Sequence, residues 1–196
     1  MFYSIVSALF RMCFRAFFTV EITGMENIPK SGKLILCSNH KTILDPLFYM
    51  AFFPRQPFFM GKDAAFKNYF IGSFLKRMGA FPVARGQRDE KAIEKALSIL
   101  QEEKVLGMFP EGKRVQENQA GAKKGIGKLA LAVDAPLIPA ALVTNFELFS
   151  KVRCKIGKVI NISKNDYQEL SNDVYYRVSN EVLNTIYRMA ADDESD

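Results

Sequence analysis

One histidine occurs in the sequence, His40, within the segment SNHKTILDP of residues 38–46. It directly follows the apolar run 33–38, which has the length of a buried strand. Sites in α/β sheets usually form at such strand ends. Asp45 follows five residues later, so a turn could bring its carboxylate to one imidazole nitrogen and leave the other nitrogen to accept a proton. This pair predicts general-base chemistry; the alternative is a structural histidine with Asp45 as a helix cap.

A second group of reactive residue types stands in MFPEGKR, residues 108–114. The apolar run before it should deliver this segment to the end of a buried strand. Gly112 permits a tight turn and the close approach of a ligand. Lys113 and Arg114 are suited to phosphate, and Glu111 can orient cations or bond to a substrate hydroxyl. The alternative is an ordinary charged turn.

Further cations follow short apolar runs. Arg85 ends the stretch GAFPVAR of residues 79–85, and Lys124 stands with Lys123 and Lys128 at the predicted start of a helix. The N-terminus of a helix attracts anions, and lysines beside it strengthen that attraction. A solvated charged face is the alternative for the lysines.

Taken together, four ordered segments resemble the glycerolipid acyltransferase family, and within it the bacterial 1-acylglycerol-3-phosphate acyltransferases. They are Asn39–Asp45 (Asn-His, four variable residues, Asp), Gly79–Arg85, Phe109–Val115 and the proline-containing apolar stretch Ala135–Ala140. They span the region 33–143 in the family's order. The resemblance implies an α/β fold and an acyltransferase activity.

The resemblance also implies roles for individual residues. His40 would be the general base and Asp45 its partner. The phosphate of the acceptor would be bound by Arg85, Glu111, Gly112 and Arg114. Lys113 departs from the family by replacing a small hydroxyl residue and adds a cation beside Arg114, and Val115 replaces a serine. Lys62 and Lys124 also stand at positions that resemble the family's pattern. Lys62, or backbone amides near the segment Gly79–Arg85, could stabilise an oxyanion.

The implied reaction moves a fatty acyl group from acyl-CoA or acyl carrier protein to the 2-hydroxyl of lysophosphatidic acid (1-acylglycerol 3-phosphate), giving phosphatidic acid. No cofactor and no metal are expected. One alternative keeps this chemistry but uses glycerol 3-phosphate or another lysophospholipid as the acceptor. An alternative of another class is a non-catalytic module that binds anionic lipid.

The length and composition fit one globular domain. The chain has 196 residues, of which 48% are hydrophobic, and a net charge of +6. This composition excludes a disordered chain, and the charge favours anionic partners. Aromatic-interleaved basic stretches are not evident, so we expect no nucleic-acid partner. The three cysteines match no disulfide or zinc pattern.

The apolar segment 2–20 is expected to form an amphipathic helix in the membrane interface. Arg11 and Arg15 would be costly at the centre of a spanning helix, and they share one helix face on which they could meet headgroup phosphates. The segment does not match a signal peptide. The alternative is a helix that covers the core. We therefore expect a peripheral or monotopic protein at the cytoplasmic face of the cell membrane, attached to its anionic surface.

Alternating apolar runs and amphipathic segments predict a single α/β domain with a largely parallel mixed sheet flanked by helices. The expected organisation is an interfacial helix over 1–22, an acyltransferase domain over 23–191 and an acidic tail over 192–196. The expected strands are 33–38, 57–60, 80–83, 105–109, 137–143 and 155–162. The expected helices are 44–53, 68–78, 89–103, 123–133 and 174–189.

Overall fold

The computed structural model describes residues 1–84, 89–115 and 121–194. Within them, a seven-stranded sheet has the order β1-β7-β6-β2-β5-β3-β4. The strands are β1 (Thr19–Thr23), β2 (Leu34–Ser38), β3 (Pro57–Lys62), β4 (Ala80–Val83), β5 (Val105–Met108), β6 (Leu137–Val143) and β7 (Lys151–Ile156). All neighbouring pairs are parallel except β6 and β7, which are antiparallel. The expected single α/β domain with a largely parallel mixed sheet is confirmed.

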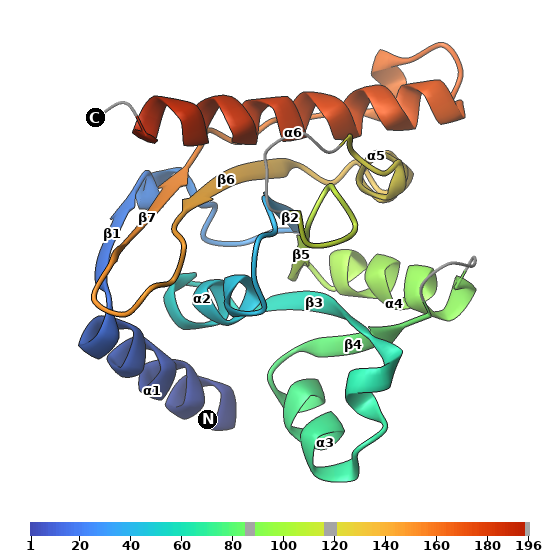
Figure 1. The fold of residues 1–196 in the computed structure, drawn as a ribbon. Helices are drawn as coiled ribbons and strands as arrows, with labels where there is room; N and C mark the ends of the chain where they lie inside the picture. Colours follow the sequence, from blue (N-terminus) through green and yellow to red (C-terminus); the bar gives the residue numbers. More distant parts are fainter. Residues whose placement is uncertain (85–88, 116–120, 195–196) are drawn as a thin grey trace.

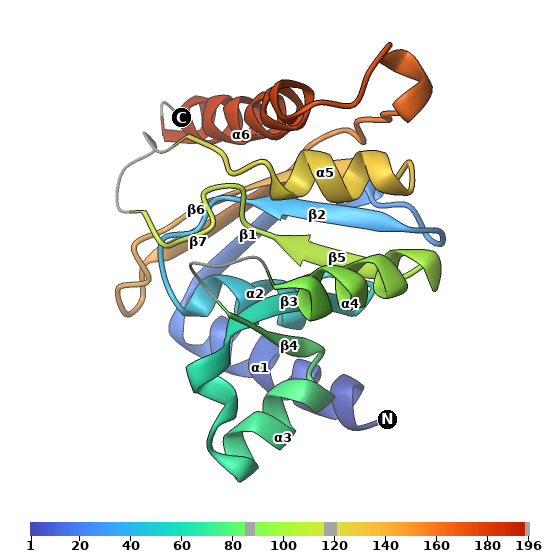
Figure 2. The same cartoon turned by 90° about the vertical axis from the view of Figure 1, so that its right-hand side faces the viewer.

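Helices cover both faces of the sheet (Figures 1 and 2). They are α1 (Phe2–Phe17), α2 (Leu44–Phe52), α3 (Tyr69–Arg77), α4 (Glu90–Gln101), α5 (Gly125–Ala132) and α6 (Asn172–Glu194), with short 3-10 turns at Met25–Asn27, Asp63–Phe66 and Lys164–Asp166. One core cluster packs α1 and α2 against the sheet, and a second packs α4, α5 and α6 on the opposite face. Because β2 is covered on both faces, every residue of LILCS is buried.

Three expected boundaries were wrong. The N-terminal helix ends at Phe17 rather than near residue 22, because the β-branched sequence of Thr19–Thr23 forms the edge strand β1. The last strand is Lys151–Ile156 rather than 155–162; its alternating residues Val152, Cys154 and Ile156 face the core. Helix α6 continues through Glu194, into the segment that was expected to be an acidic tail.

Polar side chains attach α1 to the carboxyl end of α2. The hydroxyls of Tyr3 and Ser7 each donate to Met50 O at 2.9 Å, and Arg11 Nε donates to Ala51 O at the same distance. These carbonyls lie in the last turn of α2, where backbone acceptors lack partners within the helix. Phe14 adds a buried aromatic contact. Arg11 is therefore turned toward α2 rather than away from the protein.

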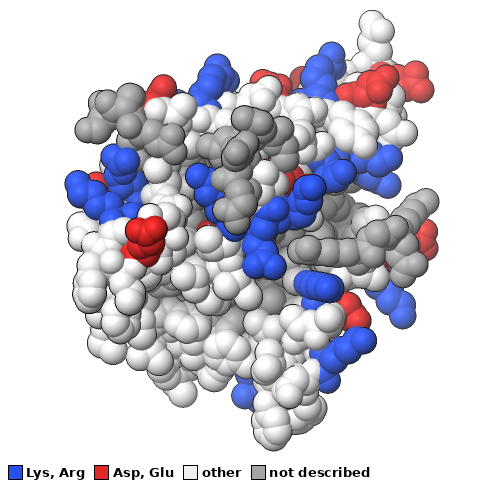
Figure 3. Space-filling view, viewed as in Figure 1, with Lys and Arg blue, Asp and Glu red and all other residues white. Residues whose placement is uncertain are grey.

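The outward side of α1 is apolar. Ile5, Leu9 and Met12 are more than half exposed, and they lie three and four residues apart on one helix face. Figure 3 shows a broad area without charged side chains over α1, at the lower left. None of the helices in the described ranges combines the length and hydropathy needed to cross a bilayer.

Candidate active site

The site lies where β2 and β5 end side by side, on the face turned to the viewer in Figure 1. Strand β2 delivers His40 to this edge, and α2 begins four residues later with Asp45 in its first turn. His40 Nδ1 and Asp45 Oδ2 are 2.8 Å apart. With the carboxylate as acceptor, Nδ1 carries the proton, and Nε2 is the nitrogen that can take a proton from a substrate. The predicted pairing of these two residues is present.

Asp45 is fixed in place by more than the histidine. Its Oδ2 accepts the backbone N–H groups of Lys41 and Thr42 at 2.7 and 2.8 Å, and its Oδ1 accepts the Thr42 hydroxyl at 2.9 Å. The carboxylate is only 2% exposed. It therefore organises the turn between β2 and α2 as well as the imidazole. Asp45 is not the helix cap that was the alternative, because it lies in the first turn of α2 and the cap residue is Ile43, which makes no side-chain cap hydrogen bond.

The plane of the imidazole is set by a stack of rings. The ring centroids of His40 and Phe109 are 4.0 Å apart with an interplanar angle of 16°, and Phe59 also stacks on Phe109, at 5.5 Å between centroids. His40 and Phe109 follow the ends of β2 and β5, and Phe59 lies within β3, the next strand in the sheet. The stack and the Asp45 contact together restrain the orientation of the imidazole.

The loop after β5 encloses the backbone of His40. Glu111 Oε1 accepts the His40 N–H at 3.3 Å, and the Val115 N–H donates to His40 O at 2.7 Å. Gly112 makes the turn possible, because its φ of +66° is a left-handed conformation that favours glycine. The first and third sequence segments are thus brought together by adjacent parallel strands.

Glu111 is a buried acid in the described part of this loop. Its Oε1 also accepts the hydroxyl of Tyr187, on α6, at 3.2 Å. Its Oε2 is buried and has no hydrogen-bond partner among the described residues. Burial raises the pKa of Glu111, and the hydrogen bonds at Oε1 partly offset the shift. An unpartnered buried oxygen beside the histidine is suited to accept a hydrogen bond from a ligand.

The predicted cationic residues are not gathered as closely as His40, Asp45 and Glu111. Lys113 and Arg114 are exposed on the loop that carries Glu111, and Lys62 is the exposed last residue of β3, at the same edge of the sheet. Lys124 is turned elsewhere, since its Nζ donates to Asn172 at the start of α6 at 2.9 Å. Arg85 lies outside the described residues. Lysine and arginine side chains gather near the centre of this face in Figure 3.

Two further side chains hold the site in ways that the sequence did not indicate. Asn39 continues the pairing of β2 with β6: its Nδ2 donates to Leu142 O at 2.9 Å, and its Oδ1 accepts the Leu142 N–H at 2.8 Å. Tyr187 lies 76 residues from Glu111 and outside every motif. The hydroxyl of Ser38, the neighbour of the histidine, pairs with the Tyr49 hydroxyl at 2.7 Å and so points away from the site.

An aspartate-held histidine at the carboxyl edge of a mostly parallel sheet is an arrangement suited to general-base catalysis in an α/β enzyme. Comparisons with known proteins specify the class further. The model of the Acyltransferase family matches residues 19–143, which is more than half of the chain. The chain belongs to the acyltransferase family.

Individual relatives support this assignment. The chain is 30% identical to the 1-acyl-sn-glycerol-3-phosphate acyltransferase of Bacillus subtilis over 84% of each sequence. It is 31% identical to the protein of that name from Streptococcus pneumoniae, over 84% of this chain and 63% of that one. The crystal structure of the LPA acyltransferase of Thermotoga maritima has the same fold, with a TM-score of 0.78 at 20% identity over 99% of this chain and 80% of that one.

Proposed function

We propose that the protein transfers a fatty acyl group from acyl-CoA or acyl carrier protein to the 2-hydroxyl of 1-acylglycerol 3-phosphate, forming phosphatidic acid. The observation that carries the proposal is the His40–Asp45 pair, held by the same loop that supplies Glu111. The names of the Bacillus and Streptococcus relatives support the choice of acceptor. The reaction needs no cofactor in this proposal.

In the proposed mechanism, His40 Nε2 removes the proton from the acceptor hydroxyl as its oxygen attacks the thioester carbonyl carbon. Asp45 keeps Nδ1 protonated and stabilises the imidazolium that forms. The tetrahedral intermediate then collapses, the carbon–sulfur bond breaks, and the imidazolium returns its proton to the leaving thiolate. A general base of this kind contributes about 10²–10⁴-fold to the rate.

The acceptor is positioned by the loop after β5 in this proposal. Arg114 and Arg85 bind the phosphate, with Lys113 adding charge beside Arg114. Glu111 Oε2, which is buried without a partner among the described residues, accepts a hydrogen bond from the glycerol. Lys62, at the end of β3, is the proposed oxyanion donor, and Lys124 contributes positive charge farther away.

We also propose that the enzyme acts as a peripheral protein at the cytoplasmic face of the membrane, with the apolar outward side of α1 in the anionic lipid interface. The exposure of Ile5, Leu9 and Met12 supports this placement. A helix with a continuous apolar face can lie in the boundary between headgroups and acyl chains. A non-spanning helix is sufficient for this attachment.

Mass spectrometry of the products tests the proposed reaction. The purified protein is incubated with acyl-CoA or acyl carrier protein and with a mixture of 1-acylglycerol 3-phosphate, glycerol 3-phosphate and other lysophospholipids. Phosphatidic acid should dominate the products, and the His40→Ala variant should form almost none. Dominance of another acceptor would refute the choice of substrate, and no acyl transfer by the wild type would refute the enzymatic proposal itself.

A further inference from the structure

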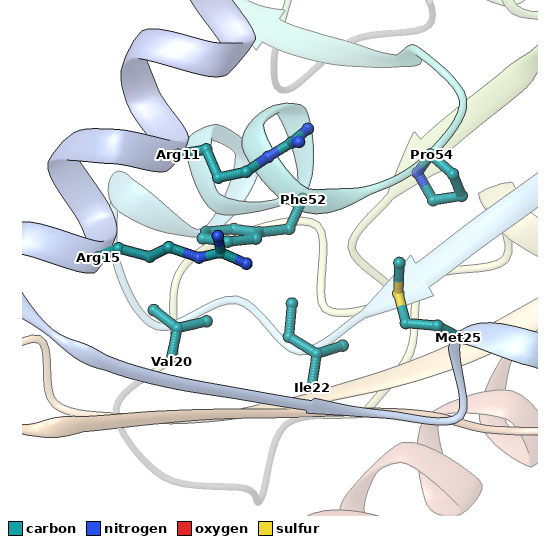
Figure 4. Close-up of a pocket in the computed structure, with 7 residues that line it drawn as sticks. All are labelled: Arg11, Arg15, Val20, Ile22, Met25, Phe52 and Pro54. Carbon is teal, nitrogen blue, oxygen red and sulfur yellow. The ribbon is translucent and has the colours of Figure 1, made fainter.

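A pocket of about 430 Å³ lies between α1, β1 and the carboxyl end of α2 (Figure 4). Its walls are formed by Val20, Ile22, Met25, Phe52 and Pro54, and Arg11 and Arg15 complete the lining. The pocket is separate from the candidate active site, because Asp45 lies in the first turn of α2 and Phe52 is the last residue of that helix. Its size is within the range of small-ligand sites.

The two arginines are held in place but not neutralised. Arg11 Nε donates to Ala51 O, which leaves the terminal N–H groups of its guanidinium for other partners. Arg15 lies over the Phe52 ring, 5.9 Å from its centroid. Figure 4 shows both side chains extending from α1 toward Phe52. In the part of the chain that the structure describes, no ion pair joins either guanidinium to a carboxylate.

Glu21, the acidic residue of β1, does not neutralise the two arginines. Glu21 stands between Val20 and Ile22, and alternate residues of a strand point to opposite faces. Val20 and Ile22 line the pocket, and Glu21 instead forms an ion pair with Lys151 at 3.7 Å. The pocket therefore carries positive charge over apolar walls, a combination that suits an amphiphilic anion.

The geometry favours a phosphate that is attached to an apolar group. Residues four apart on a helix are neighbours on its surface, so Arg11 and Arg15 give the same pocket two guanidinium groups that can bind phosphate. Inorganic phosphate would use the two arginines and leave the apolar walls without a partner. Arg15 and the exposed Met12 are three residues apart on α1, so they are neighbours on its surface. An acyl chain could therefore pass from the pocket along the outward side of the helix.

We infer that this pocket is a binding site for the headgroup phosphate of one anionic phospholipid, distinct from the site of the acceptor. The inference rests on the proposed placement of α1 in the membrane interface and makes it more specific. It assigns Arg11 and Arg15 to a single lipid molecule rather than to the general negative potential of the surface. The bound lipid would hold α1 and the carboxyl end of α2 together.

The test uses short-chain phosphatidylglycerol, because this phospholipid is neither the proposed acceptor nor the proposed product. It is added below its critical micelle concentration. Calorimetry measures its binding to the wild type and to the Arg15→Gln, Lys95→Gln and Arg114→Gln variants. Each variant loses one positive charge; Lys95 is exposed on α4, across the sheet, and Arg114 belongs to the candidate active site. Thermal unfolding checks that each variant is folded, and Arg15→Lys serves as a milder change.

Arg15→Gln should weaken phosphatidylglycerol binding by about tenfold or more, as expected for the loss of a charged hydrogen-bond donor. The other two charge-removing variants should bind like the wild type. An equal loss of affinity in all three variants would mean that binding depends on net charge alone and would overturn the inference. A loss confined to Arg114→Gln would place the lipid in the candidate active site instead. Inorganic phosphate binding as tightly as the lipid would overturn the assignment to a phospholipid.

Acyl transfer to a soluble acceptor, measured on the same proteins, separates this inference from the proposed function. Arg15→Gln should retain it. A wild type that binds the lipid with the expected Arg15 dependence but lacks acyltransferase activity would refute only the proposed function. An active wild type that does not bind phosphatidylglycerol would refute only the lipid site.

Discussion

The Tyr187 hydroxyl donates to Glu111 Oε1 across 3.2 Å, which joins the closing helix α6 to the loop after β5. The same oxygen accepts the backbone N–H of His40. Glu111 thus connects three segments of the chain, and Tyr187 restrains its carboxylate from a helix that contains none of the four family-like segments. In the proposed function, we expect Tyr187 to be a positioning residue that acts through Glu111.

Tyr187→Phe should raise the KM of the acceptor and lower kcat/KM by about 3–10-fold, the usual effect of losing one hydrogen bond. Because that bond favours the charged carboxylate, its loss should raise the pKa of Glu111 further and move the acid limb of the pH–rate profile to higher pH. Tyr176→Phe, a change at an exposed position on α6, is the control. An unaltered acid limb and an unaltered KM would exclude this role.

His40→Ala should lower turnover by at least about 10²-fold while the thermal unfolding midpoint stays close to that of the wild type. Asp45→Asn should cause a comparable loss of turnover and should also destabilise the protein. An amide nitrogen at the position of Oδ2 would face the N–H groups of Lys41 and Thr42, which now donate to it. Kinetics and calorimetry on both variants check the difference. Near-normal turnover of His40→Ala would disprove the mechanism.

The stability of the protein should report the ionisation of Glu111. Burial raises its pKa above the ordinary value of 4.5, so this group contributes stability below that value, and the contribution is lost as the pH rises through the folded-state pKa. Glu111→Gln removes the dependence. The free energy of unfolding of the wild type should therefore fall relative to that of the variant on going from about pH 4 to about pH 8. Denaturant titrations measure it; a constant difference would contradict the prediction.

Arg114→Lys should raise the KM of the acceptor by about tenfold, because an ammonium group cannot form the forked contact that a guanidinium makes with phosphate. Arg85→Ala should have a similar or larger effect. Steady-state kinetics with each substrate varied in turn should show little change in the KM of the thioester. Arg77→Lys, on α3, is the matched control. A defect limited to the donor would reassign the two arginines to the phosphates of coenzyme A.

Membrane attachment is tested on the outward side of α1, because deletion of the helix would also remove the buried Phe14 and the contacts to α2. Ile5→Gln combined with Leu9→Gln should weaken binding to anionic vesicles by about tenfold or more, through loss of apolar burial in the interface. Leu170 is also exposed and apolar, and Leu170→Gln should leave vesicle binding unchanged. Vesicle flotation measures all three proteins. Full flotation of the double variant would place the membrane-binding surface elsewhere.

Local patterns predicted the centre of the candidate site well. The five-residue separation of His40 and Asp45 spans a single turn, so their contact depends little on the rest of the fold. The glutamate loop was predictable as a strand end, although its position beside His40 required β2 and β5 to be neighbours. Tyr187 could not be predicted, because nothing in its surroundings in the sequence distinguishes it from other tyrosines of an amphipathic helix.

The wrong boundaries have similarly specific causes. The apolar segment at the N-terminus hides the change from helix to strand, since Phe17 and Phe18 suit either structure. In β7, charged residues alternate with Val152, Cys154 and Ile156, and this period-two pattern was a usable signal. The longer apolar appearance of 155–162 favoured the wrong range. Within residues 157–162, an isolated bridge between Ile160 and Leu137 is the one β-bridge to the sheet.

Helix α2 has a different partner at each end: α1 binds the carbonyls of its last turn, and Asp45 occupies its first turn. With nine residues, α2 spans about 13 Å. The length of this helix therefore contributes to the separation between the proposed base, His40, and the proposed anchoring helix. A constant separation would keep His40 at one depth relative to the lipid headgroups. Inserting one helical turn into α2 would change that depth by about 5 Å and leave the identity of every reacting group unaltered.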